Sequence, residues 1–256
     1  YAGEYEIKEA RIFSSSGNII PLESLLVGIE LFENVFSYAI TGSITLLDTN
    51  SVVLNLPIIG QEYLSLKIST PLVNPQKNDI IDFTENVFSI YKIDTRIEGE
   101  QAEVVKLHFM SPEGLRNNRT RVSKSYTNSI DKIVTDVIQN ERYLNSKKDV
   151  FVEGTVGVRK IIAPNSRPYI FIKKLSTEAV SLEHGSPYFL FYENKDGIHF
   201  RSLDSLYAQS VVSEYNTGDF FHQNSSGTVV KNVMEDYGRS ISHQIIESND
   251  MISNIR

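Results

Sequence analysis

The chain has 256 residues, a formal net charge of −7, 41% hydrophobic and 22% charged residues, and no cysteine. This length accommodates one or two domains with a substantial core, and the ordinary composition excludes wholesale disorder. The absence of cysteine excludes disulfides, thiolate metal sites and cysteine nucleophiles, and the acidic balance argues against a general nucleic-acid-binding protein.

The first 110 residues predict about six β-strands. Residues 39–48 (AITGSITLLD) alternate apolar and polar side chains with the period of two that is typical of a half-buried strand. The same alternation occurs in residues 63–69 and 103–110. Three further segments have a strand-like composition: residues 4–13, 25–33 and 86–97. Because no helix separates these short strands, they favour an antiparallel sheet or barrel, and we assign a first β-barrel domain to residues 1–111.

After Ser111-Pro112 the spacing of the apolar residues becomes helical. In NSIDKIVTDVIQNERYL, Asn128 or Ser129 can serve as the N-cap of a helix. The apolar stripe of this helix consists of Ile130, Ile133, Val134, Val137 and Ile138. A second helix is predicted after Ser166, which can act as its N-cap, with Pro168 in the first turn. Its stripe consists of Phe171, Ile172, Leu175, Ala179 and Leu182.

The stretch YFLFYENKDGIHFRSLDSL, residues 188–206, predicts a β-hairpin with Asp196-Gly197 at its turn. Such an apolar hairpin is marginal alone, and the two predicted helices provide the layer that covers it. We therefore predict a small α/β domain over residues 112–206, with two helices packed on a hairpin-containing sheet. The predicted fold class is mainly β with α+β, and residues 207–256 follow this domain.

The residues that usually carry catalysis or bind metals show no recognisable pattern. The five histidines are far apart in sequence and form no HxH or HxxxH pair: His108, His184, His199, His222 and His243. Asp131 and Asp136 lie five positions apart on the predicted helix, and we interpret them as part of a solvated face. There is no G-x-S-x-G motif, and the GTVGVRK segment from Gly154 lacks the spacing of a phosphate loop. We therefore expect no metal, no cofactor and no enzymatic activity.

No apolar run approaches the roughly 18 residues of a membrane-spanning helix. We therefore expect no direct insertion into a membrane.

A basic cluster in LRNNRTRVSKSY follows the strand-rich part of the chain: Arg116, Arg119, Arg121 and Lys124. One interpretation is a solvated interdomain connector. Another is an interdomain or intersubunit contact, since the planar donors of arginine suit carboxylates on an acidic neighbour. A DNA-binding role is the least supported of the three, because the chain is acidic.

Four stretches, in this order, resemble the baseplate hub proteins of contractile-tailed phages of the T-even type and their cyanophage relatives. The first is ELFENVFSYAITGSITLLDTNSVVLNLPIIGQEYLSLKI, residues 30–68, and the second is SPEGLRNNRTRVSKSY, residues 111–126. The third is IIAPNSRPYIFIKKLS, residues 161–176, and the fourth is YFLFYENKDGIHFRSLDSLY, residues 188–207. Each motif alone is weak, but four in sequence over about 180 residues make coincidence improbable.

The resemblance implies a structural subunit of a trimeric ring. In that family each subunit contributes two related β-barrels, so that the ring adapts a sixfold tail tube to a threefold spike. The implied partners are two further copies of the chain, a spike or needle protein, and a tail tube or tube-initiator protein, with baseplate wedge proteins as further neighbours. DNA is expected to pass through the channel without specific binding. The expected location is the tail baseplate of a virion assembled in the host cytoplasm.

The sequence leaves two alternative functions open. One is the hub-like N-terminal region of a type VI secretion spike-type protein. The other is a carbohydrate-binding or hydrolytic β-barrel tail module. The resemblance also implies that residues 207–256 form a linker and the start of a second, incomplete barrel. Residues 208–256 are too few to complete that barrel, so we expect either a truncated sequence or a homologue that is divided differently.

Overall fold

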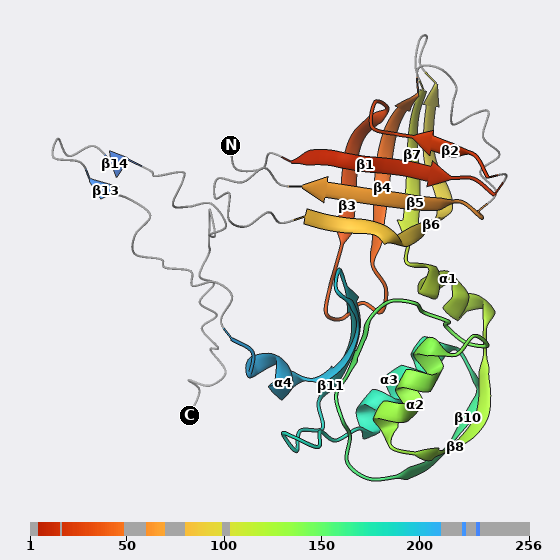
Figure 1. Cartoon of the computed structure of the whole chain (residues 1–256), viewed down its shortest axis with the longest axis vertical. Helices are drawn as coiled ribbons and strands as arrows, with labels where there is room; N and C mark the ends of the chain where they lie inside the picture. Colours follow the sequence, from red (N-terminus) through yellow and green to blue (C-terminus); the bar gives the residue numbers. More distant parts are fainter. Residues whose placement is uncertain are drawn as a thin grey trace, which may run out of the picture. The chain divides into compact units, whose positions relative to one another are not determined.

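Figure 1 shows the computed structural model of the chain, which divides into two units. One unit comprises residues 5–70 and 79–209 and contains every element up to α4. The structure describes residues 5–15, 17–48, 60–69, 80–98, 103–210, 222–223 and 229–230. In the other unit the described residues are Ser210, β13 (His222–Gln223) and β14 (Val229–Val230), and the two strands pair antiparallel. The rest of the predicted second barrel lies outside the described residues.

The N-terminal part of the larger unit is a seven-stranded antiparallel sheet with the order β2-β1-β5-β6-β7-β4-β3. Its strands are β1 (Glu6–Phe13), β2 (Ile19–Pro21), β3 (Leu26–Phe32), β4 (Thr41–Asp48), β5 (Tyr63–Ser69), β6 (Ile80–Glu98) and β7 (Glu103–Met110). The six predicted strands are all present, which confirms a mainly antiparallel β fold. β2 is an additional strand that the sequence pattern did not reveal.

The long strand β6 turns the sheet onto a second layer. Its first part pairs with β5, up to Ser89 opposite Tyr63, and its second part pairs with β7, starting at Ser89 opposite Met110. Figure 1 accordingly shows β1 and β5 crossing β3, β4 and β7 at a steep angle. The apolar side chains between the layers form one buried cluster that includes Ile44, Leu46 and Phe109.

The sheet is open in the described part of the chain, where the sequence predicted a closed barrel. The two ends of the strand order, β2 and β3, do not pair with each other there. A physical reason lies in β2, which is only three residues long and ends at Pro21. Because proline has no backbone N–H to donate, it cannot continue a hydrogen-bonded ladder.

Residues 112–207 form a second, mixed part. Its elements are α1 (Pro112–Arg119), β8 (Val122–Asn128), α2 (Ile130–Gln139), β9 (Val150–Val152), β10 (Arg159–Ser166), α3 (Pro168–Glu178), β11 (Phe189–Asn194), β12 (Gly197–Ser202) and α4 (Leu203–Tyr207). β8 and β10 form a two-stranded antiparallel ribbon, and β12 pairs antiparallel with β11 and parallel with β9. Helices α2 and α3 contact strands of this small sheet, as predicted for residues 112–206.

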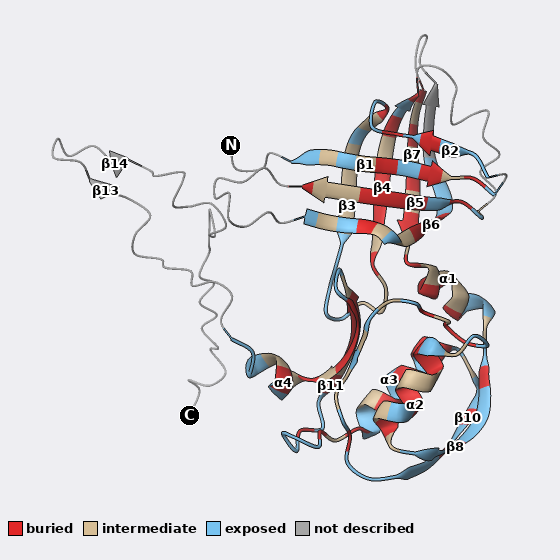
Figure 2. Cartoon of the chain, in the orientation of Figure 1, coloured by how far each residue is buried: buried red, intermediate tan, exposed pale blue. Residues whose placement is uncertain are grey.

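The predicted apolar stripe of α2 is buried in full, and Figure 2 shows stretches of red on the overlapping helices α2 and α3. Its side chains share one core with α3 and with the hairpin residues Phe189, Phe191, Ile198 and Phe200. This core is separate from the cluster inside the seven-stranded sheet. The division of the chain into domains at residues 111 and 206 stays a prediction.

Three details of the predicted helices need correction. Ser129 is the N-cap of α2, but the N-cap of α3 is Arg167, because Ser166 still belongs to β10. Helix α3 ends at Glu178, so Leu182 does not extend its apolar stripe and is 69% exposed. The segment after Ser111 forms the helix α1, which was not predicted; a solvated interdomain connector was one interpretation of the basic cluster that begins there.

The hairpin turn is shifted by one residue from its predicted position. Lys195 and Asp196 form the two-residue loop, and Gly197 is the first residue of β12, opposite Asn194. The Asn194 side chain accepts hydrogen bonds from the backbone N–H groups of Asp196 and Gly197 at 3.0 and 3.1 Å. Gly197 has a φ of +147°, and a Cβ there would lie 2.3 Å from the backbone oxygen of Asp149. Only glycine fits this position.

Replacing Gly197 with alanine should lower the free energy of unfolding by about 2 kcal/mol or more, because the methyl group meets the Asp149 carbonyl in a strained backbone conformation. Gly157→Ala is the matched control, since Gly157 also has a positive φ of +78° but has no atom within 4 Å of the added Cβ. Urea denaturation of both variants checks the prediction. Equal losses of stability would show that the contact with Asp149 contributes nothing.

Candidate functional site

The seven-stranded sheet and the mixed part are joined by a buried cluster of three charged side chains. The Lys148 Nζ donates hydrogen bonds to Glu113 Oε2 on α1 at 2.8 Å and to Glu193 Oε1 on β11 at 2.5 Å. The three side chains are only 7%, 6% and 1% exposed, in the order Lys148, Glu113 and Glu193. Removing charged groups from water costs free energy, so a buried ion pair needs further hydrogen-bonding groups around it.

The sheet and the loop before Lys148 supply those groups. Glu193 Oε2 accepts a hydrogen bond from the backbone N–H of Ile40 at 3.2 Å, and Glu193 Oε1 accepts one from the Ser111 hydroxyl at 2.8 Å. The Ser146 hydroxyl donates to Glu113 Oε1 at 2.6 Å. Ile40 immediately precedes β4 and Ser111 immediately follows β7, so Glu193 binds the ends of two strands of the sheet. The cluster therefore fixes how the mixed part meets the sheet.

The protonation of this cluster follows from its burial. Burial raises the pKa of Glu193 more than the neighbouring Lys148 lowers it, and the carboxylate of Glu113 raises it further. For Lys148, burial alone would lower the pKa, but the two carboxylates outweigh burial and raise it. The lysine therefore stays charged, and at least one negative charge must remain opposite it.

The sequence pattern did not identify this cluster. Its three members are far apart along the chain, and charged residues at such distances show no spacing rule. The one available signal was Glu193, a charged residue at a buried position of the aromatic strand β11. A buried carboxylate normally requires a partner, but the sequence cannot say which cation provides it.

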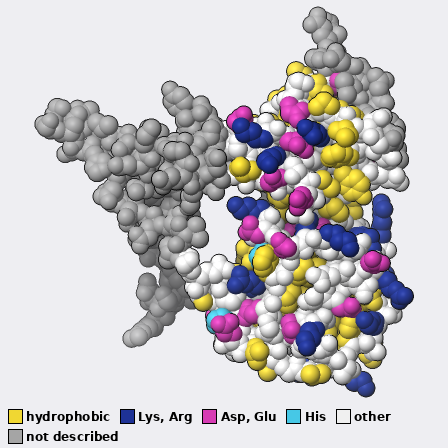
Figure 3. Space-filling model, in the orientation of Figure 1, with side chains coloured by type: hydrophobic (Ala, Val, Ile, Leu, Met, Phe, Trp, Pro, Cys, Tyr) yellow, Lys and Arg dark blue, Asp and Glu magenta, His cyan; other side chains and the backbone are white. Residues whose placement is uncertain are grey.

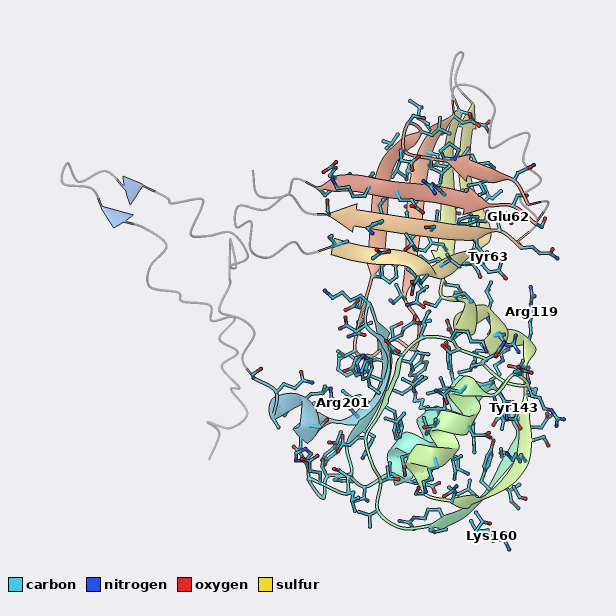
Figure 4. The ribbon with its side chains drawn as sticks, viewed as in Figure 1. Glu62, Tyr63, Arg119, Tyr143, Lys160 and Arg201 are labelled. Carbon is cyan, nitrogen blue, oxygen red and sulfur yellow. The ribbon has the colours of Figure 1, made fainter. Side chains whose placement is uncertain are left out.

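A hollow of about 610 Å³ lies beside this junction, between the sheet and α1. Residues from both parts line it, including Tyr63, Ser89, Leu115, Arg116, Arg119 and Asn145. Figure 4 shows Tyr63 at the start of β5 and Arg119 at the end of α1. The lining mixes aromatic, aliphatic and cationic side chains, which suits contact with another polypeptide better than with a small apolar ligand.

Two members of the predicted basic cluster, Arg116 and Arg119, line this hollow. The Arg116 guanidinium donates from Nε to the backbone oxygen of Tyr143 at 2.8 Å, and from Nη2 to the backbone oxygen of Glu141. Arg116 therefore holds the turn after α2 against α1. Arg119 is exposed, and among the described residues it forms no ion pair.

The other two members point to different surroundings. Arg121 is exposed and donates only to the backbone oxygens of Asn118 and Thr120, at 3.3 and 2.9 Å. Lys124 on β8 forms an ion pair of 3.1 Å with Asp136 and lies 4.6 Å from the centre of the Tyr126 ring. The structure thus does not bring the four cations together at one site. Their role as interdomain or intersubunit contacts stays a prediction.

The aspartates of α2 accept more hydrogen bonds from neighbouring segments than residues on a solvated face would. Asp136 accepts hydrogen bonds from the Tyr126 hydroxyl at 3.0 Å and from Asn140 at 3.1 Å. Asp131 accepts one from the Thr155 hydroxyl at 2.8 Å. These bonds tie α2 to neighbouring segments, so the predicted solvated face is partly wrong. Burial and the hydrogen bond to Asp136 both raise the pKa of the Tyr126 hydroxyl, which stays neutral.

His108 and His199 of the larger unit have different surroundings. His108 pairs with Asp94 at 3.1 Å on the surface of the sheet. His199 is buried between the rings of Phe151 and Tyr192, at centroid distances of 4.7 and 4.8 Å, and burial lowers its pKa. His243 lies outside the described residues. Within the described ranges there is no group of three His, Asp or Glu side chains that could hold a metal ion, and no helix with the length and apolarity needed to span a membrane.

An exposed apolar patch lies at the end of β3 and on the loop that follows it. Phe36 is 75% exposed, Phe32 is 59% exposed and Val35 is 43% exposed. A shallow hollow of about 290 Å³ beside them is lined by Val35, Phe36, Tyr38, Lys173, Ser176, Phe189, Leu190 and Phe191. Contiguous exposed aromatic side chains commonly mark a protein–protein contact.

Comparison with known proteins gives one sequence relative of interest. No protein-family model matches the chain. Over 205 residues the chain is 22% identical to the "Probable baseplate hub protein gp334" of Vibrio phage KVP40, which covers 77% of this chain and 47% of that protein. The chain therefore spans about half the length of this curated relative. The predicted resemblance to baseplate hub proteins is confirmed as a weak sequence match.

Solved structures show the fold. The 43 kDa tail protein of prophage MuSo2 from Shewanella oneidensis aligns with a TM-score of 0.50 at 8% identity, over 75% of this chain and 54% of that one. The E. coli c3393 protein, a component of the type VI secretion system, aligns with a TM-score of 0.43 at 11% identity, over 77% of this chain and 48% of that one. At this identity the likeness to the prophage protein shows that the two chains share a fold.

Proposed function

We propose that this chain is a structural subunit of a phage tail baseplate, the hub that joins the tail tube to the spike. The observation that carries the proposal is the sequence match over 205 residues to a probable baseplate hub protein. The tail-protein fold supports it. The subunit would reside in the virion tail and have no enzymatic activity of its own.

The proposed assembly is a trimeric ring. Closed cyclic symmetry with two similar sheets per subunit creates six similar docking surfaces, which resolves the mismatch between a sixfold tube and a threefold spike. The seven-stranded sheet would be one of these two sheets. The hollow beside α1 and the exposed patch at Phe36 are candidate surfaces for the spike, the tube protein and wedge proteins.

A ring of this kind surrounds a channel for DNA. Residues 1–111 contain fifteen acidic and seven basic side chains, so the part that contains the seven-stranded sheet is strongly acidic. An acidic wall does not exchange counterions with phosphates and therefore does not hold DNA in place. The charge of the sheet thus supports a channel through which DNA passes without specific binding.

We expect the protein to form trimers that bind the cognate spike protein. Multi-angle light scattering at micromolar concentration and moderate salt, with and without the spike, measures the mass of both species. A strict monomer under both conditions would remove the hub proposal. Turnover of peptidoglycan by a homogeneous preparation, lost on replacing one carboxylate, would instead favour a hydrolytic tail module.

A further inference from the structure

Charge is distributed unevenly between the two parts of the molecule. Residues 112–209 contain eleven acidic and fifteen basic side chains, the reverse of the balance in residues 1–111. The mixed part is therefore net basic in a protein whose total charge is −7. Such a separation of charge favours contacts between unlike parts of neighbouring molecules.

The cations of the sheet are largely neutralised within the chain. Five of them form ion pairs with nearby carboxylates: Lys8 with Glu6, Arg11 with Glu9, Lys67 with Asp82, Lys92 with Asp94 and Lys106 with Glu30. Three exposed carboxylates of the sheet part have no ion pair with any described residue: Glu23, Glu33 and Glu85. The sheet part therefore presents surplus negative charge.

The cations around the β8–β10 ribbon differ in this respect. Five of them are exposed and form no ion pair within the described ranges: Arg119, Arg121, Arg159, Lys160 and Arg167. Figure 3 shows Lys and Arg side chains along the side of the molecule where β8 and β10 lie, and Figure 4 places Lys160 far from Arg119 on that side. We call these five residues and the ribbon between them the basic strip.

The outer face of the ribbon is shaped for contact. Register places Thr127 opposite Lys160 and Ser125 opposite Ile162. These side chains are exposed, Ile162 by 68%, and Figure 2 shows most of the ribbon in the colour of exposed residues. Small hydroxyl side chains make a flat surface with hydrogen-bonding groups, and one exposed isoleucine provides an apolar centre.

We propose that the basic strip binds the acidic sheet part of a neighbouring copy of this chain. Because the two surfaces differ, the contact is heterologous, and heterologous contacts are the kind that close into a ring of three. The inference rests on the proposed trimeric hub and specifies which surfaces meet. The unpaired guanidinium groups would bind carboxylates of the neighbour, and Ile162 would be buried at the centre of the contact.

Charge reversal at the strip is the first test. In R159E/K160E, two exposed cations become carboxylates that repel the acidic neighbour, so self-association should weaken roughly tenfold or more. K132E/K174E is the matched control, because it makes the same change in net charge at one exposed lysine of α2 and one of α3, neither of which lines a candidate docking surface. Sedimentation velocity over a concentration series measures the effect, and thermal melting checks that both variants are folded.

Further measurements distinguish a direct contact at the basic strip from long-range electrostatic attraction between the subunits. Raising the salt concentration should dissociate the wild-type trimer progressively, since exposed charges are screened over about 10 Å at 0.1 M salt. I162A should weaken association without changing its salt dependence. Zero-length carbodiimide cross-linking of a mixture of 15N-labelled and unlabelled protein should join Lys160 of one copy to a carboxylate in residues 1–111 of another.

The outcomes distinguish this inference from the hub proposal itself. A trimer that R159E/K160E and I162A leave intact would overturn the docking surface while the hub proposal stands. Cross-links from Lys160 only to residues 112–209 would also overturn it. If a random-sequence DNA duplex binds the wild type and R159E/K160E abolishes that binding without affecting the trimer, the strip is a nucleic-acid surface instead.

Discussion

Replacing Lys148 with methionine should lower the free energy of unfolding by about 3–5 kcal/mol, because it leaves two carboxylates buried without a cation. Glu113 and Glu193 are 6% and 1% exposed at their side chains, so water cannot replace the ammonium group. Urea denaturation measures the loss. Methionine preserves most of the volume of the lysine side chain, so the effect reports the charge and its hydrogen bonds.

The triple variant K148M/E113Q/E193Q is the control for this interpretation. Its amide groups retain hydrogen-bonding capacity toward Ser111 and Ser146 but carry no charge, so it should lose less stability than K148M alone. If both variants melt as the wild type does, the cluster contributes nothing to stability. If the triple variant is the less stable of the two, hydrogen bonding rather than charge holds the junction.

The loss in K148M should also depend on pH. Burial already raises the pKa of Glu193 in the folded wild type, and removing the cation raises it further. An acid with a raised pKa in the folded state binds its proton there first, so lowering the pH favours the folded protein. The difference between K148M and the wild type should therefore be smaller at about pH 5 than at about pH 8. A difference that is constant over this range would contradict the burial of an unpaired carboxylate.

Val134→Asp should destabilise the protein by about 3 kcal/mol or more, since it places an unpaired charge in the core shared by α2, α3 and the hairpin. Val134 is completely buried. The control is Lys132→Asp, which introduces the same side chain at an exposed position of the same helix. Thermal unfolding followed by circular dichroism compares the two. Equal melting temperatures for Val134→Asp and the wild type would mean that α2 buries a different face.

The two effects probe different parts of the architecture. Val134 stabilises the mixed part internally, whereas Lys148 stabilises its junction with the sheet. In the proposed hub subunit, which would join a tube to a spike, a weakened junction should impair assembly even where each part remains folded. Binding of the spike by K148M, compared with Val134→Asp at equal folded fraction, would separate these roles.

Local patterns in the sequence determined most of the secondary structure. The period of two in β4, β5 and β7 and the helical stripe of α2 depend only on which side chains must leave water, and each lies within ten residues or so of chain. The hairpin at β11 and β12 was readable for the same reason, because a tight turn fixes the register of its own strands. The prediction was wrong where two local signals compete. Ser166 was predicted as the N-cap of α3, but it is the last residue of β10, and Arg167 is the N-cap.

Only the tertiary structure determined which residues form the buried cluster at the junction and which exposed cations lack an ion pair. Glu113, Lys148 and Glu193 carry no mutual spacing signal, because the fold brings them together from α1, from the loop before β9 and from β11. Which cations lack a partner is likewise a property of the folded surface: Lys124 looked equivalent to Arg121 in the sequence, yet only Lys124 meets a carboxylate, Asp136. Periodicity reports burial along one element, whereas ion pairing depends on distances between elements, and those distances exist only once the chain has folded.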